Sequence, residues 1–402
     1  PHTYRDIPRH GRMLSHAVPM LLWGRQILPV QNRNGASTLK DADDGSPIGG
    51  PIALDNSELE ANRIHPLDLG AHHILDDEFY AGRTPDFSKI TAPFLSGANW
   101  GGMGLHLRGN VQGFMQSASD QKWLEVHGSN HYIPFFSPEG QALQKQFFDH
   151  FLKGEENGWK DRAPILLSVR YPGETFERRE EFEWPLARTE WSTFPLDAAN
   201  MSLGSTNPDQ PSSVSYEALK DAAVFQTVAF KEQTEITGPI AANLWVSSST
   251  TDMDLFVTLQ LFDPQGNEVT FEGASEDAVP IAQGWLRASQ RKIDGARSTP
   301  YQPYHTHDEV RPLTPDEAVE VQVEVWPTSI VVPEGYTLAL PIEGKDFSRA
   351  PGGAGLMTGS GPFLHNDPKD RPADIFGGTN TIHTGGDSDS HLVLPIIPSK
   401  DS

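Results

Sequence analysis

Hydrophobic residues follow two different spacings along this chain, and the change comes near residue 160. Before it, short apolar runs alternate with an amphipathic stretch of helical spacing; after it, apolar residues recur at every second position in many short segments. A period of about 3.6 indicates a helix with one buried face, and a period of two indicates a strand. The chain therefore predicts an α/β segment followed by an all-β domain.

Residues 91–160 have the order strand, loop, helix, strand, loop, helix. Two apolar runs, 92–95 and 122–126, are each followed by a polar loop. The last helix should begin after Ser137, a capping residue, and end at Gly154. In an α/β hydrolase, the acid and the histidine of the catalytic triad follow the nucleophile on two such loops. We therefore expect the closing half of an α/β-hydrolase domain here.

Beyond residue 162 the chain predicts at least six strands. In 253–262, apolar residues alternate with other residues, a pattern that only a half-buried strand explains well. In 319–325, valine alternates with Glu and Gln in the same way. The other strand-like runs are 165–171, 236–247, 337–342 and 392–397. Many short strands separated by Pro and Gly turns are typical of a β-sandwich or jelly roll.

The first 90 residues are the least regular part of the chain. A helical pattern over 57–80 is interrupted by proline and glycine, which suits a lid over an active site and equally any irregular insertion. The predicted fold is thus α/β plus all-β. It consists of a helical cap or lid region over 1–90, the carboxyl-terminal part of an α/β-hydrolase domain over 91–160, and a β-sandwich jelly-roll (galactose-binding-like) domain over 161–402.

Composition narrows the classes of function. The chain has 31 Lys and Arg against 54 Asp and Glu, and its formal net charge of −23 opposes binding to nucleic acid or to an anionic membrane. It has no cysteine, which excludes disulfides and thiol catalysis. The longest apolar cluster, 18–23, is too short to span a bilayer. Because the first residue is Pro1, the lack of a signal peptide leaves the compartment open, with the cytoplasm slightly favoured.

Three blocks of residues resemble one family of serine hydrolases. The blocks are Tyr4-Arg5-Asp6 with His10-Gly11-Arg12-Met13-Leu14; Asp77-Glu78-Phe79-Tyr80 with Pro85 and Ile90-Thr91-Ala92-Pro93; and Gly284-Trp285-Leu286-Arg287-Ala288-Ser289, Pro327-Thr328-Ser329 and His383-Thr384-Gly385-Gly386. In order and spacing they are similar to the entry into the cap, the return from it and the jelly roll of the cocaine-esterase and X-Pro dipeptidyl-peptidase type, the CocE/NonD family. The resemblance covers nearly the whole chain.

The resemblance implies hydrolysis of esters or amides through Ser, Asp and His. The serine of such enzymes lies on a strained turn between a strand and a helix and is flanked by glycines. No G-x-S-x-G string occurs in the 402 residues. We therefore expect the amino-terminal, nucleophile-bearing part upstream of Pro1 or on another chain; a relic without this chemistry is the third alternative.

His131 is the candidate general base, because it lies in the loop after the second predicted strand, where the fold presents its histidine. Its neutral imidazole would take the serine proton and later return it to the leaving group. A surface loop histidine without a role is the alternative. His127 lies closer to the end of the strand and is the competing histidine, which we expect to pack beside the site.

The position of the catalytic acid is unusual. The resemblance implies a Trp followed closely by Asp, but the loop after the first strand carries Asn99 and Trp100. An Asn bears no charge to stabilise an imidazolium and can hold the wrong tautomer, a defect worth about 10⁴ in turnover in a well-studied protease. Asp120 or Glu125 could substitute from nearby sequence, although Glu125 could equally face solvent. A helix-capping role is the structural alternative for Asn99.

Aromatic residues near the two loops are candidates for an acyl pocket. They are Trp100, Tyr132 and Phe135, which ordinary packing would explain equally well. We expect no cofactor and no metal. The string His305-Thr306-His307-Asp308 has ligand types at a strand-like spacing, but nothing nearby in sequence supplies a clear further ligand.

These patterns predict a hydrolase that forms an acyl-enzyme from a small-molecule ester or amide. The alternatives are a non-catalytic jelly-roll binding protein for carbohydrate or peptide, and one subunit of a two-chain hydrolase. The expected protein partner is a companion chain that carries the nucleophile, or a further copy in a homo-oligomer; no nucleic acid or membrane partner is expected. Exposed apolar surface on the 92–126 segment would favour the companion, since a half sheet must bury its open edge.

Overall fold

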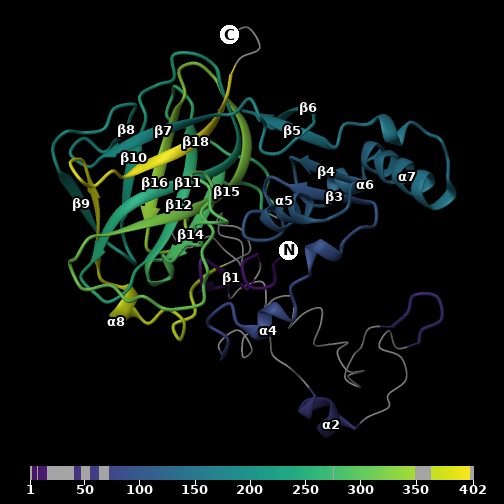
Figure 1. Ribbon diagram of the computed structural model, residues 1–402, viewed down its shortest axis with the longest axis horizontal. Coiled ribbons are helices and arrows are strands. Elements are labelled where there is room, and N and C mark those ends of the chain that lie inside the picture. Colours follow the sequence, from purple (N-terminus) through teal and green to yellow (C-terminus); the bar gives the residue numbers. More distant parts are fainter. Residues whose placement is uncertain are drawn as a thin grey trace.

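The structure has a β-rich body on one side and a smaller layer of helices and parallel strands on the other (Figure 1). It is a computed structural model that describes residues 2–6, 8–15, 40–46, 55–62, 72–274, 276–348 and 364–398. Sixteen strands from these ranges form one hydrogen-bonded sheet, which runs from the parallel layer into the body. Backbone hydrogen bonds therefore join the layer to the body.

The body is a barrel-like β-sandwich. Its two long strands, β11 (Thr234–Ser248) and β15 (Val319–Val332), pair antiparallel over most of their length. The other strands of the body are β7 (Glu190–Asp197), β8 (Ser202–Leu203), β9 (Ser212–Glu217), β10 (Ala222–Gln226), β12 (Asp254–Phe262), β13 (Glu268–Val269), β14 (Ala282–Arg287), β16 (Thr337–Glu343), β17 (Thr379–Thr384) and β18 (His391–Ile397). Their inward side chains, mainly Leu, Ile and Val, form one core whose burial is the main stabilising contribution.

The layer has three parallel strands, with β6 (Thr175–Glu181) added antiparallel at β5. The parallel strands are β3 (Phe94–Asn99), β4 (Lys122–His127) and β5 (Ile165–Tyr171). Its helices are α5 (Leu107–Gln116), α6 (Ile133–Phe136) and α7 (Pro138–Lys153). Because β3 is the first strand in the sheet order, its outer edge has no partner strand within the described ranges.

The N-terminal residues lie between the body and the layer (Figure 1). The hairpin of β1 (Arg9–His10) and β2 (Met13–Leu14) packs on β14, where a Cβ at Gly11 would meet Trp285 O at 2.3 Å. Short helices are α2 (Asn56–Ala61), α4 (Glu78–Ala81) and α8 (Ala373–Phe376), with 3₁₀ turns at Phe87–Lys89, Trp159–Asp161 and Ala288–Gln290. None of the helices in the described part of the chain is long and apolar enough to cross a bilayer.

Several predicted elements are confirmed. All six strand-like runs beyond residue 162 are strands, and their ends agree within seven residues. The hydroxyl of Ser137 accepts a hydrogen bond from Gly140 N at the start of α7, and Gly154 ends that helix with a φ of 71°. The helical pattern over 57–80 corresponds to α2 and α4. Residues 16–39, 47–54 and 63–71 of the predicted cap lie outside the described ranges.

The expectation that β12 is half-buried is wrong, since both of its faces are covered. On the second face, Arg371 Nε lies 2.7 Å from a carboxylate oxygen of Asp254, and the ring of His365 lies 5.5 Å from that of Phe256. These covering residues come from the region that follows β16 in the chain. A period of two predicts a strand but does not tell whether another segment covers its second face.

Candidate functional site

The predicted site residues lie where β3 and β4 end side by side. The two strands are parallel and in register, so that Asn99 at the end of β3 pairs with His127 at the end of β4. Just beyond this pair, Trp100 N donates a hydrogen bond to His127 O at 2.9 Å. The structure therefore brings together the two loops that the strand order had suggested.

His131 lies between β4 and α6 and is partly buried. Its Nδ1 atom is buried and has no hydrogen-bond partner among the described residues. The ring of His106, at the start of α5, lies 5.4 Å from that of His131 between centroids. Burial lowers the pKa of His131, and the neighbouring His127 lowers it further. The imidazole is therefore neutral at pH 7 and able to accept a proton.

Asn99 is buried and contacts the backbone of the loop that carries His131. Its Nδ2 donates a hydrogen bond to Ser129 O at 2.6 Å, while its Oδ1 has no partner in the described part of the chain. The alternative that Asn99 caps the next helix is wrong, because the capping position of α5 belongs to His106. A role for Asn99 at the position of the catalytic acid stays a prediction.

His127 belongs to a different cluster. Its Nδ1 lies 2.8 Å from Oε2 of Glu125, and Oε1 of Glu125 accepts a hydrogen bond from Arg178 at 2.7 Å. Glu125 is buried, so the alternative that it faces solvent is wrong. Of the two candidate substitute acids, Glu125 contacts the competing histidine, and Asp120 lies exposed before β4.

The three aromatic candidates lie in two different environments. Trp100 is buried in the core, where its indole N–H donates to Ser168 O at 2.7 Å and its ring lies 6.3 Å from that of Trp184. Tyr132 and Phe135 are 65% and 52% exposed at and within α6. Substrate contact stays a prediction for all three.

A loop of the body, with residues 271–274 and 276–279 described, lies between the two loops of the site. An isolated β-bridge closes it at its ends. Ala274 N donates to Gly101 O at 3.2 Å, and Ala274 O accepts a hydrogen bond from His131 N at 3.0 Å. The body therefore links the loop after β3 to the loop after β4.

Glu272 of the same body loop holds the turn before His131. Its Oε2 accepts hydrogen bonds from Ser129 Oγ at 2.6 Å and from Asn130 N at 3.1 Å. A carboxylate oxygen of Glu174 in turn accepts from the backbone N–H of Glu272. Sequence reasoning missed Glu272 because 143 residues separate it from Ser129 and no local motif marks it.

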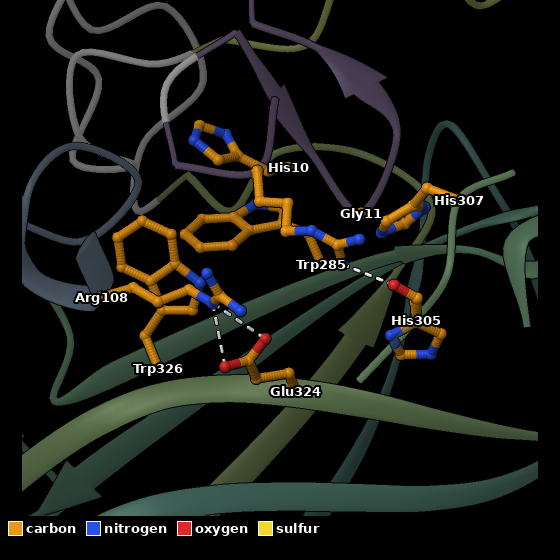
Figure 2. A pocket seen from close by; sticks show the side chains of 9 residues that line it. His10, Gly11, Arg108, Trp285, His305, His307, Glu324 and Trp326 are labelled. Atoms are coloured by element: carbon orange, nitrogen blue, oxygen red, sulfur yellow. Dashed lines mark hydrogen bonds and ion pairs between the residues drawn. The ribbon is translucent and has the colours of Figure 1, made fainter. Parts of the chain in front are cut away.

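A separate cavity of about 30 Å³ lies between the N-terminal hairpin, α5 and the body (Figure 2). Two arginines that line it are paired with carboxylates. Arg108 has two such contacts, Nε to Glu324 Oε1 and Nη1 to Asp6 Oδ1, each at 2.9 Å. Arg5 Nη2 lies 3.0 Å from Asp76 Oδ2. A buried charge is tolerated when it is paired and hydrogen-bonded, so these contacts serve to join the N-terminal residues to the layer and the body.

His305 and His307, from the string with metal-ligand types, line this cavity and are buried (Figure 2). Burial lowers the pKa of His305 to about 3 and that of His307 well below its ordinary value, and Arg5 acts in the same direction. Asp308 is exposed and lies 2.8 Å from Lys292 instead. No group of three His, Asp or Glu side chains suited to a metal ion occurs where the structure describes the chain.

The chain is similar to known hydrolases over most of its length. Residues 157–393 match the family model of the X-Pro dipeptidyl-peptidase C-terminal non-catalytic domain. A cocaine esterase from Rhodococcus sp. (strain MB1 Bresler) is 23% identical over 299 residues, which are 64% of this chain and 46% of that protein. A crystal structure of a CocE/NonD family hydrolase from Staphylococcus aureus has 30% identity and a TM-score of 0.82, covering 98% of this chain and 66% of that chain.

A more distant structure shares the fold. An aminopeptidase from the marine sediment archaeon Thaumarchaeota archaeon has a TM-score of 0.66 at 13% identity, covering 98% of this chain and 70% of that chain. The present chain spans less than half the length of the curated cocaine esterase that it matches. The match to the C-terminal domain model, which extends over more than half of the chain, and the agreement with the staphylococcal structure show that this chain belongs to the CocE/NonD family of hydrolases.

Proposed function

We propose that this chain combines the closing part of a serine-hydrolase catalytic domain with the β-body, and that His131 is the general base for cleavage of an ester or amide. One observation carries the proposal. His131 lies on the loop at the carboxyl end of a parallel strand, next to the loop of the neighbouring strand, in surroundings that keep its imidazole neutral. An α/β hydrolase presents its catalytic histidine at such a place.

In this mechanism, His131 takes the proton of the serine hydroxyl as the serine oxygen attacks the carbonyl carbon. The imidazolium then gives the proton to the leaving oxygen or nitrogen, which departs and leaves the acyl-enzyme. Water next attacks the acyl carbon while His131 takes its proton, and the proton returns to the serine oxygen as the acid is released. The lowered pKa of His131 favours the base form at neutral pH. The serine comes from outside these 402 residues, which contain no G-x-S-x-G string.

We place the nucleophile-bearing part on the surface formed by α6, α7 and the outer edge of β3. Six large apolar side chains at α6 and α7 are between 51% and 76% exposed: Tyr132, Ile133, Phe135, Phe136, Phe148 and Leu152. They lie outside the 92–126 segment, whose described residues include one exposed large apolar side chain, Met115 at 37%. Proteins rarely leave an apolar patch or an open strand edge uncovered. The staphylococcal hydrolase supports this occupant, since it has further chain beyond the 66% that the present chain covers.

The test is labelling of protein from its native source with a fluorophosphonate, followed by peptide mapping. We expect one labelled serine, outside these 402 residues. His131→Asn should slow labelling by at least about 10²-fold, because a positioned general base contributes about 10²–10⁴. The matched variant His127→Asn should keep most of the rate, because His127 is paired with Glu125.

Absence of a label in folded protein would contradict the proposal. The family model that matches the body describes a non-catalytic domain, so the result would then favour the jelly-roll binding protein. Binding of the unlabelled protein to a carbohydrate or peptide array would support that alternative. A label on a separate polypeptide would identify a two-chain hydrolase.

A further inference from the structure

We propose that the β-body positions the general base: its 271–279 loop, through Glu272 and Ala274, holds His131 in place. The role of His131 as a base rests on the function proposed above. The contacts of Glu272 and Ala274 with the loop that carries His131 are independent of that function. A domain whose family description is non-catalytic would thereby take part in the site.

The turn before His131 is strained and needs outside contacts to persist. Ser129 has a φ of 62°, in the left-handed region, which is unfavourable for a residue with a Cβ. Such backbone persists only where its surroundings hold it. Asn99 does so from β3 through Ser129 O, and Glu272 does so from the body through Ser129 Oγ.

The contribution of Glu272 is a charge-assisted pair of hydrogen bonds. One oxygen of its carboxylate accepts from Ser129 Oγ at 2.6 Å and from Asn130 N at 3.1 Å. Hydrogen bonds to an ionised acceptor are roughly twice as strong as those between neutral groups. Glu174 holds Glu272 in turn by accepting from its backbone N–H. The body therefore contacts both residues that precede His131 and, together with Asn99, holds them in this conformation.

Ala274 acts on the backbone of His131 itself. Its carbonyl accepts the hydrogen bond from His131 N at 3.0 Å, and its N–H is bound to Gly101 O of the neighbouring loop. This hydrogen bond fixes the position of the His131 backbone relative to the carboxyl ends of β3 and β4. A displacement of about 1 Å in a catalytic group can cost about 10²-fold in rate, so this contact bears directly on catalysis.

The test is an NMR pH titration of the His131 imidazole in the full chain, with His131→Gln to identify its signal. Among the described residues, the titratable rings next to His131 are His106 at 5.4 Å and Tyr132 at 5.7 Å, and His127 acts on His131 through its charge. Glu272→Gln keeps the shape of the side chain but replaces a charged acceptor by an amide. We expect the turn to loosen and His131 to become more solvated, so that its pKa rises toward the ordinary value of about 6.5.

The matched control is Asp277→Asn, which removes the same charge from an exposed position of the same loop. It should leave the His131 titration unchanged. A second variant, Ser129→Ala, removes one of the two hydrogen bonds from the other side and should raise the pKa by a smaller amount. If Glu272→Gln does not fold, the His131 titration in Ser129→Ala tests the inference instead.

An unchanged His131 titration in folded Glu272→Gln, or in Ser129→Ala where the first variant does not fold, would overturn the inference. The outcome is independent of the labelling experiment. If His131→Asn leaves fluorophosphonate labelling intact while Glu272→Gln shifts the titration, the proposed function fails and the positioning of His131 by the body stands.

Discussion

Glu343 shows how burial acts on a single side chain of the body. It ends β16, is 8% exposed, and its Oε2 has no hydrogen-bond partner within the described residues. Burial raises the pKa of Glu343 to about 7; Lys345 opposes this rise and Asp346 adds to it. A buried carboxylate without a partner costs free energy of folding whenever it is ionised.

Glu343→Gln should therefore stabilise the protein at pH 8 and change little at pH 4. The folded pKa of about 7 lies above the unfolded value of 4.5, so folding takes up a proton between these values and stability falls as the pH rises through this window. The gain at pH 8 should be at most about 3 kcal/mol. Urea unfolding of both proteins at the two pH values measures it.

The control for this prediction is Glu334→Gln, an exposed glutamate in the turn between β15 and β16. Its unfolding should follow that of the parent protein at both pH values. Equal pH profiles for Glu343→Gln and the parent would show that ionisation of Glu343 is not linked to folding.

Candidate site residues could be picked out only where a local pattern marks them. His131 and Asn99 became candidates because each follows an apolar run that predicts a strand. The partners of these residues were not predictable. Asn99 binds Ser129 O, and Glu272 binds Ser129 Oγ across 143 residues, and both contacts depend on how the loops approach each other in space.

At the scale of elements, the loop after β3 and the 271–279 loop fit against one another at a glycine. A Cβ on Gly101 would lie 2.6 Å from Gly273 Cα and 2.7 Å from Glu272 O. Both atoms belong to the backbone and cannot rotate away. The absence of a side chain at Gly101 thus permits the hydrogen bond from Ala274 N.

Gly101→Ala should push the two loops apart. We expect a loss of about 1–3 kcal/mol in the free energy of unfolding, the range for overpacking a tight site, together with a rise in the pKa of His131. Urea unfolding and the NMR titration of His131 measure the two effects.

Gly295→Ala is the matched control, since no atom lies within 4 Å of its Cβ position. It should change the stability by no more than about 0.5 kcal/mol. An equal effect of both substitutions would contradict the close fit at Gly101.

Elements were predictable where local chemistry decides them. As expected, α7 begins after its cap, Ser137, and ends at Gly154, which has a left-handed conformation. The covered second face of β12 was not predictable, because Arg371 and His365 reach it from more than 100 residues away.

At the scale of the molecule, α6 and α7 lie at the outer end of the layer (Figure 1). Both helices carry large apolar side chains that are exposed in this chain. If the nucleophile-bearing part covers this surface, charges placed there should interfere with it. We expect the double variant Phe148→Asp with Leu152→Asp to reduce fluorophosphonate labelling of the native-source protein at least tenfold. Because both side chains are exposed in this chain, the fold of the body and layer should persist, as circular dichroism can verify.

Val228→Asp is the control, since Val228 is 82% exposed on the body and far in sequence from the layer. It should leave labelling unchanged. Full labelling of the double variant would contradict the placement of the nucleophile-bearing part on α6 and α7.

The sequence by itself determined the kinds of element and their order. Alternation of apolar residues, capping residues and turns act between neighbours in the chain, so they predicted the strands of the body, the limits of α7 and the loop that carries His131. Only the tertiary structure decided what surrounds His131. The body loop reaches it through Glu272 and Ala274, and His106 comes from the preceding helix. These contacts join residues that no local pattern relates, because they depend on how strands far apart in the sequence pair in one sheet.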